Sequence, residues 1–158
     1  MTLLVLLWML LGAVFGRAAI LEFLFGAPDR SAVSFRSLVP PATPNTYLLC
    51  PPGYCDAARQ TVPSPEFDVP AERLHSAWMD MLDRQPRVTV LREDEALRQV
   101  DVEQRSLLVG YPDTVTVRFL PLPQARSTLA VYSRSHYGRS DYGVNRERIE
   151  TWLADLRL

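Results

Sequence analysis

The sequence contains no lysine, so arginine supplies all 17 of its basic residues. They are offset by 18 acidic residues, which gives a formal net charge of -1. A general nucleic-acid-binding protein needs a basic surface to displace counterions from phosphates, so this composition argues against a nucleic-acid partner. Because arginine is the only strong cation in the chain, a cluster of arginines is weaker evidence for a binding site here than elsewhere.

Cysteine and histidine are also scarce, with two of each among the 158 residues. Two cysteines are too few for a disulfide scaffold or a four-cysteine zinc site. The sequence also lacks the Gly-x-Ser-x-Gly elbow, the phosphate-binding loop, the His-Glu-x-x-His motif and the dinucleotide fingerprint. We therefore predict no catalytic residue, no metal site and no cofactor, and the balance favours a protein that is not an enzyme.

Residues 1–26 form the first part of the chain and are strongly apolar. Leu3 to Gly16 is an unbroken apolar run of 14 residues, about 21 Å of helix, which resumes after Arg17 and continues to Gly26 with Glu22 inside it. A hydrocarbon core is about 30 Å thick, so the two runs together could span a membrane with some strain. The favoured interpretation is a transmembrane signal anchor in the inner membrane; a cleaved signal peptide and a buried core helix are the alternatives.

Residues 27–66 form a proline-rich linker in this interpretation. Nine of the 13 prolines lie between residues 27 and 70, and proline neither donates to a strand ladder nor tolerates a helical residue before it. Within the linker, Pro52-Gly53 favours a tight turn that brings Cys50 and Cys55 together. A disulfide is the expected result in an oxidising compartment. Free buried thiols and a redox or metal role are the alternatives.

Residues 67–158 carry the patterns of a folded α+β domain. Apolar residues recur at helical spacing after Pro70 and again near the C-terminus, which predicts helices at about 68–85 and 146–156. Between them, four stretches alternate like strands: 87–92, 98–109, 113–120 and 127–135. We expect a four-stranded, mainly antiparallel sheet with both helices on one face, in the order α-β-β-β-β-α, preceded by the membrane helix and the linker.

One stretch concentrates chemistry: residues 133–148, called here the Gly/Arg loop. It contains two glycines and four arginines and opens the final helix, whose first N–H groups are unpaired and favour anions. Arginine forks suit carboxylate or phosphate groups. The predicted ligand-binding residues are Arg134, Arg139, Ser140, Asp141, Asn145, Arg146 and Arg148. In the alternative interpretation, these arginines pair with acidic residues such as Asp113 and Glu150 and hold the loop in place.

The run SRSHYGRSDYGVNRERIETWL closely resembles the C-terminal signature of the bacterial domain-of-unknown-function family 1499. The preceding strand, GYPDTVTVRF, and the Cys50–Cys55 element are also similar to that family, so the resemblance covers roughly residues 47–157. It implies a membrane-associated or exported bacterial protein and no particular activity.

Two signals in the sequence disagree about the side of the membrane on which the domain lies. Basic residues lie only after the apolar run, at Arg17, Arg30 and Arg36, which by the positive-inside rule places the domain in the cytoplasm. The cysteine pair and the family resemblance instead favour the periplasmic face, which is the location we expect, with the cytoplasmic face as the alternative.

Three functional hypotheses remain. The first is a membrane-anchored accessory module whose Gly/Arg loop binds an anionic group of a lipid, a small molecule or a partner protein. The second is a structural subunit of a membrane protein complex, because the charges of Arg17 and Glu22 inside a membrane span would require partner groups on another protein. The third is an enzyme acting on an anionic substrate.

Overall fold

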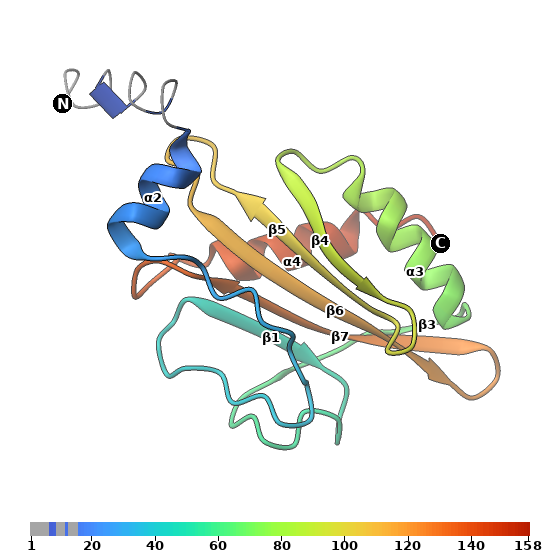
Figure 1. Ribbon diagram of the computed structural model, residues 1–158. Coiled ribbons are helices and arrows are strands. Elements are labelled where there is room, and N and C mark those ends of the chain that lie inside the picture. Colours follow the sequence, from blue (N-terminus) through green and yellow to red (C-terminus); the bar gives the residue numbers. More distant parts are fainter. Residues whose placement is uncertain (1–6, 9–11, 13–15) are drawn as a thin grey trace.

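A computed structural model describes Leu7, Trp8, Gly12 and residues 16–158 (Figure 1). Within these residues the chain builds seven strands and three helices of nine or more residues, which makes an α+β domain. The helices are α2 (Arg17–Phe25), α3 (Ala71–Leu82) and α4 (Val144–Ala154). The strands are β1 (Thr46–Cys50), β2 (Val62–Pro63), β3 (Glu66–Phe67), β4 (Val88–Asp94), β5 (Gln99–Arg105), β6 (Pro112–Leu122) and β7 (Arg126–Ser135).

The strands form one mixed sheet in the order β2-β1-β7-β6-β5-β4, with β3 also pairing with β7. All pairings are antiparallel except the short parallel contact between β1 and β2. The expected four-stranded sheet is therefore wrong, because the proline-rich stretch adds three strands. β1 fits between Pro44 and Pro51, so its own N–H groups are all available for pairing. Pro63 lies in β2, the outermost strand, where a missing N–H is tolerated.

Both α3 and α4 pack on the same face of the sheet and enclose the main core (Figure 1). At its centre, Trp78 of α3 meets Trp152 of α4 edge to face, with ring centroids 5.9 Å apart. Phe119 of β6 lies 6.2 Å from Trp78 in the same manner. Since all three rings are almost fully buried, their contact fixes where the two helices sit relative to the sheet.

The expected N-terminal membrane helix is not found, and the inner-membrane location that depended on it is corrected with it. Of the residues that the structure describes, none belongs to a helix long and apolar enough to cross a membrane. Residues 1–6, 9–11 and 13–15 of the expected span lie outside the described residues. Helix α2 has nine residues, about 14 Å, less than half of a hydrocarbon core.

Helix α2 instead packs against the end of the sheet. Leu21 is only 2% exposed, and the ring of Phe25 contacts those of Tyr111 and Tyr137. Glu22 lies 3.6 Å from the guanidinium of Arg30. The charge that would be costly inside a bilayer is therefore matched by a partner within the protein.

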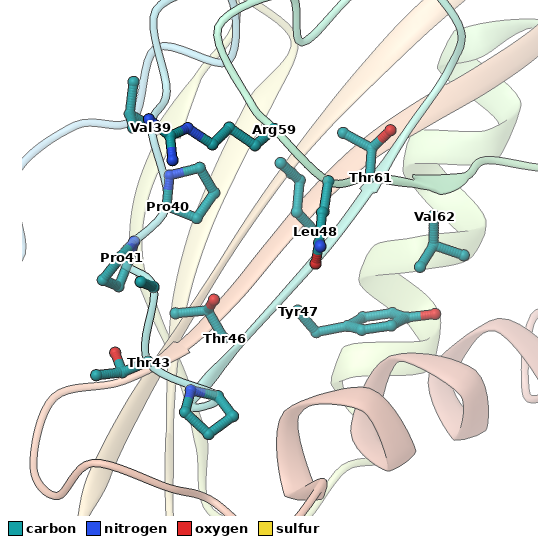
Figure 2. Close-up of a pocket in the computed structure, with 13 residues that line it drawn as sticks. Val39, Pro40, Pro41, Thr43, Thr46, Tyr47, Leu48, Arg59, Thr61 and Val62 are labelled. Atoms are coloured by element: carbon teal, nitrogen blue, oxygen red, sulfur yellow. The ribbon is translucent and has the colours of Figure 1, made fainter.

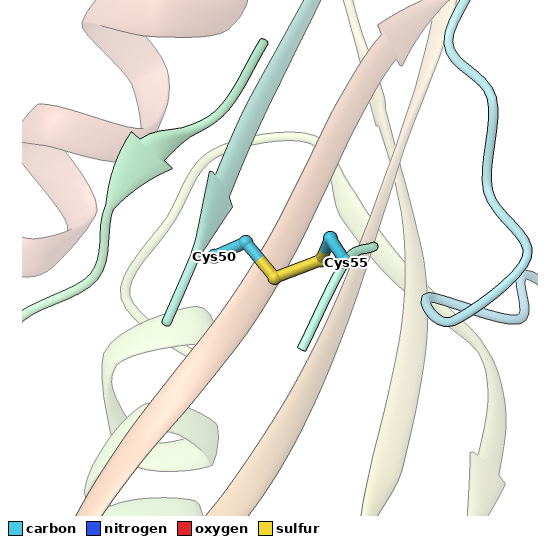
Figure 3. The surroundings of a disulfide bond; sticks show 2 residues. All are labelled: Cys50 and Cys55. Carbon is cyan, nitrogen blue, oxygen red and sulfur yellow. A yellow bond between two sulfur atoms is a disulfide. The ribbon is translucent and has the colours of Figure 1, made fainter. Parts of the chain in front are cut away.

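The second face of the sheet is covered by the chain that leads into and follows β1. Val33 and Phe35 pack there against Leu48 of β1 and Tyr132 of β7. The structure joins Cys50, at the end of β1, to Cys55 through a disulfide in this smaller core (Figure 3). The turn between them is closed by the N–H of Tyr54, which donates to the Pro51 carbonyl, with Gly53 at a positive φ of 71°.

Replacing both Cys50 and Cys55 by Ser should lower the free energy of unfolding by about 2 kcal/mol, the chain-entropy expectation for a six-residue closed loop. Urea denaturation followed by tryptophan fluorescence measures this. A reductant should shift the wild-type transition by the same amount and leave that of the double variant unchanged. Identical transitions for the oxidised and reduced wild type would contradict a stabilising role for the disulfide.

Candidate functional site

The Gly/Arg loop joins β7 to α4 through a turn that needs two left-handed glycines. Gly138 and Gly143 both have a φ of 86°, a region that side chains disfavour. Gly143 directly precedes α4, so its conformation sets the direction in which the helix leaves the sheet. The glycines of the loop are therefore explained by the chain reversal itself.

Asn145, in the first turn of α4, is the centre of the loop's hydrogen bonding. It is fully buried. Its Nδ2 lies within hydrogen-bond distance of three acceptors: the Asn45 carbonyl at 3.0 Å, Ser135 Oγ at 3.0 Å and Asp141 Oδ2 at 2.7 Å. Its Oδ1 accepts from Ser133 Oγ at 2.6 Å. Asn145 therefore ties α4, β7 and the approach to β1 together.

Arg148, one helical turn later, is buried, and each of its three guanidinium nitrogens donates to a protein partner. One Nη donates to the carboxylate of Asp113 on β6, and the other donates to Asn145 Oδ1 at 2.7 Å and Ser133 Oγ at 3.0 Å. Nε donates to Gln104 Oε1 at 2.6 Å. A buried ion pair persists only when its desolvation is offset by such additional hydrogen bonds. Arg148 thus holds α4 against three strand positions.

The other arginines of the loop differ in how far they are engaged. Arg134 donates from Nε to Thr114 Oγ1 at 3.1 Å and from Nη2 to the Asp29 carbonyl at 2.8 Å. Arg146 pairs with Glu150 at 2.7 Å on the exposed side of α4. Arg139 is exposed, and no hydrogen bond or ion pair joins it to the described part of the chain.

Asp141 caps the loop's entry into α4. Its carboxylate accepts from the backbone N–H groups of Gly143 at 3.1 Å and Asn145 at 2.8 Å. Burial on its own would raise the pKa of Asp141, but these hydrogen bonds and the one from the Asn145 side chain outweigh it and hold the pKa below its usual value. Ser140 contributes a weaker contact, its Oγ accepting from the N–H of Tyr142 at 3.3 Å.

His136 belongs to the same region but was not among the predicted site residues. Its Nε2 lies 3.1 Å from Thr114 Oγ1. Burial, reinforced by the nearby Arg134 guanidinium, lowers the pKa of His136 despite the acidic groups around it. This contact could not be predicted from the sequence, because Thr114 and His136 meet only through the pairing of β6 with β7.

Beside the loop lies a large hollow, called here the β1 groove (Figure 2). It has a volume of about 1190 Å³. One wall is residues 39–44, the floor is Thr46, Tyr47 and Leu48 of β1, and the other wall is residues 59–62. Figure 2 shows the Arg59 side chain extending from its own wall toward Val39 and Pro40 of the opposite wall.

The Gly/Arg loop holds the end of this groove in place. Asn45, which lies between the wall and the floor, donates from Nδ2 to the carbonyls of Ser135 and Gly138 and accepts from Asn145. The groove was not predicted from the sequence, because its wall was interpreted as an extended linker. The signal that could have found it is the five-residue run Thr46–Cys50 between prolines, which has strand length and an apolar centre.

Part of the outer edge of β1 is unpaired. The Asn45 carbonyl accepts from Ser135 N–H, so Asn45, Tyr47 and Leu49 direct their backbone groups toward β7. Thr46 and Leu48 therefore direct theirs toward the groove. Since β2 pairs only with Leu49 and Cys50, no strand among the described residues pairs with Thr46 on that side.

Among the described residues, no group of three or more His, Cys, Asp or Glu side chains is placed to hold a metal ion. The site consists of two features. The buried pair of Asp113 and Arg148 holds the last loop and helix against the sheet, and a groove runs along the edge of β1.

The sequence of this domain matches a known protein family. A model of the family "Protein of unknown function (DUF1499)" matches residues 40–156, so the chain belongs to that family, and the resemblance carried by the C-terminal signature is confirmed. No curated protein matches the chain. The family description names no activity, so the anion-binding and enzymatic hypotheses for the Gly/Arg loop stay predictions.

Replacing Arg148 by Met should lower the free energy of unfolding by about 3 kcal/mol, because Asp113 would be left buried without its partner. In a double-mutant cycle with Asp113→Asn, the two changes should be less than additive by at least about 1 kcal/mol. The matched control is Arg146→Ala, which breaks an exposed pair on the same helix and should cost under about 0.5 kcal/mol. Equal effects of the two arginine variants would contradict the structural role of Arg148.

Asp141 should make stability depend on acidity. Its pKa is lower in the folded protein than the unfolded value near 3.8, so its contribution is complete above that value and is lost as pH falls through the folded pKa. Urea denaturation from pH 6 down to pH 2.5 should show a steeper fall for the wild type than for Asp141→Asn. Parallel curves would contradict the assignment.

Proposed function

We propose that this protein is a non-catalytic binding module that accepts an extended, acidic segment of a partner protein in the β1 groove. The observation that carries the proposal is the coincidence of a groove of about 1190 Å³ with a strand edge that is only partly paired. An extended peptide can add to such an edge as a further strand, with backbone hydrogen bonds supplying affinity and the groove walls supplying specificity.

The backbone of Thr46 supports strand addition. Its N–H and C=O point away from β7 into the groove, and the neighbouring Leu48 N–H points the same way. Parallel pairing with β2 begins only at Leu49. An incoming strand would therefore extend the line of β2 along β1 without displacing any existing pairing.

The side chains of the groove favour an extended and negatively charged ligand. Its lining contains Arg59 and no acidic residue, so a carboxylate on the ligand would meet a cation and no repulsion. Three prolines, Pro40, Pro41 and Pro44, form much of one wall. Proline loses little conformational freedom on binding, which keeps the wall in shape before the ligand arrives.

The Gly/Arg loop has a positioning role in this proposal. Arg134 and Arg148 already donate to protein acceptors, and Asn145 connects Arg148 to Asn45 at the end of the groove. The loop thus holds the groove open, and the ligand itself contacts the strand edge and Arg59.

A library of random peptides displayed on phage, selected on the full chain, tests this proposal. Enriched peptides should be acidic, and their binding, measured by calorimetry, should perturb the backbone amide resonances of Thr46 and Leu48. Arg59→Ala should weaken binding about tenfold, the size of one charge-assisted hydrogen bond. Thr46→Pro, which removes an N–H that β7 does not use, should weaken it at least as much.

The matched control is Arg73→Ala, since Arg73 is an exposed arginine of α3 that does not line the groove. Each variant is first checked for an unchanged urea transition. The proposal fails if no peptide is enriched, if the perturbed amides lie elsewhere, or if Thr46→Pro and Arg59→Ala bind as tightly as Arg73→Ala. Enrichment of basic peptides would overturn the assigned charge.

A further inference from the structure

A second hollow, called here the arginine pocket, lies where α2 begins, beside β4 at the other edge of the sheet from β1 and β2. It has a volume of about 290 Å³, and it lies between the start of α2, the start of β4 and the turn from β5 to β6. It shares no lining residue with the β1 groove. Its lining residues are Arg17, Ala18, Arg87, Thr89, Arg105, Ser106, Leu107 and Gly110.

The pocket is strongly positive. Three of its eight lining residues are arginines and none is acidic. Within the described part of the chain, neither Arg17 nor Arg87 takes part in an ion pair. Arg105 pairs with Glu103 at 2.6 Å, but Glu103 is shared with Arg30 at 2.7 Å. At least two guanidinium charges therefore lack a carboxylate partner.

The arginines are held in place through some of their donors and keep others free. Arg87 Nε donates to the Arg105 carbonyl at 2.9 Å, which leaves both Nη groups of Arg87 without a partner among the described residues. Arg105 Nη1 donates to the Gly110 carbonyl at 3.1 Å, and Arg17 makes one long contact of 3.4 Å to the Leu108 carbonyl. A guanidinium anchored at one position and open at its fork is suited to bind an oxyanion bidentately.

The turn from β5 to β6, which forms one wall of the pocket, is held in place by two hydrogen bonds to one side chain. Ser106 Oγ accepts from the N–H groups of both Gly110 and Tyr111, at 3.1 and 2.9 Å. Gly110 has a positive φ of 84°, which lets the turn close without a Cβ. A preformed pocket loses little entropy when a ligand enters.

We propose that the arginine pocket binds the phosphate group of a small phosphorylated ligand. The free Nη groups of Arg87 and the weakly engaged guanidinium of Arg17 match the charge and the several oxygens of a phosphate better than the single charge of a carboxylate. A volume of about 290 Å³ holds a phosphate together with a few further atoms of the molecule that carries it. The same chemistry is offered by a soluble phosphomonoester and by the headgroup of a phosphatidic acid.

The test uses the full chain with inorganic phosphate and glycerol 3-phosphate as probes. Both should raise the midpoint of the urea transition beyond the effect of chloride at matched ionic strength, because a ligand of the folded state stabilises it. Titration followed by calorimetry gives the affinity. Arg87→Gln should weaken binding at least tenfold, and Arg17→Gln should do so independently, while Arg73→Gln on exposed α3 should leave it unchanged.

A second arm distinguishes the source of the phosphate. Vesicles of phosphatidylcholine with and without phosphatidic acid are sedimented with the protein. Co-sedimentation that requires phosphatidic acid and is lost in Arg87→Gln, without an effect of the soluble probes, identifies a lipid headgroup; the reverse identifies a soluble ligand. The proposal is overturned if neither probe nor vesicle binds more tightly than chloride accounts for, or if Arg87→Gln and Arg17→Gln bind as the wild type does.

Discussion

The buried pair of Asp113 and Arg148 is the interaction on which the rest of the candidate site depends. Moving two charges out of water costs several kcal/mol per ion, so the pair is tolerable only with its further hydrogen bonds to Gln104, Ser133 and Asn145. Those bonds have narrow geometry, unlike apolar contacts, and they fix α4 at one position over β6 and β7. Asn145 donates to the Asn45 carbonyl, so the position of α4 also determines where the end of the β1 groove lies. A chain that needed only stability could have used apolar residues at these positions.

The two faces of the sheet are buried by different kinds of side chain. Tryptophan and aliphatic residues fill the face under α3 and α4, whereas buried Asp101 and Glu103 lie on the other face. Asp101 accepts from Thr116, and Glu103 from Arg30. The segment from Arg30 to Phe35 thus covers that face by supplying a cation as well as apolar side chains. This explains why a proline-rich stretch packs on the domain instead of extending away from it.

The spacing of apolar residues in the sequence predicted the longer helices and strands but not the short strands. The alternating stretches overlap β4 to β7, and the apolar helical spacing overlaps α3 and α4. β2 and β3 were missed because they have two residues each, too few for any period, and β1 was missed because the prolines around it were interpreted as a linker. The N-terminal apolar run was interpreted as a membrane span because sequence shows hydrophobicity but not the contacts of Leu21 and Glu22 with the folded domain. In the site, Asp113 was named as one partner for the loop arginines, but its separation of 35 residues from Arg148 left the pairing open.

In a chain without lysine, the number of arginines near one another does not identify a binding site. The Gly/Arg loop has the densest arginine sequence, yet Arg134 and Arg148 are largely occupied by protein acceptors. The arginine pocket draws Arg17 and Arg87 from positions 70 residues apart; both Nη groups of Arg87 have no partner among the described residues, and Arg17 makes one long contact. A guanidinium can bind a ligand only with donors that the fold has not already used, so its remaining donors decide its role. The number of unused donors depends on tertiary contacts, so the sequence alone cannot show which arginines of the loop or of the pocket keep donors for a ligand.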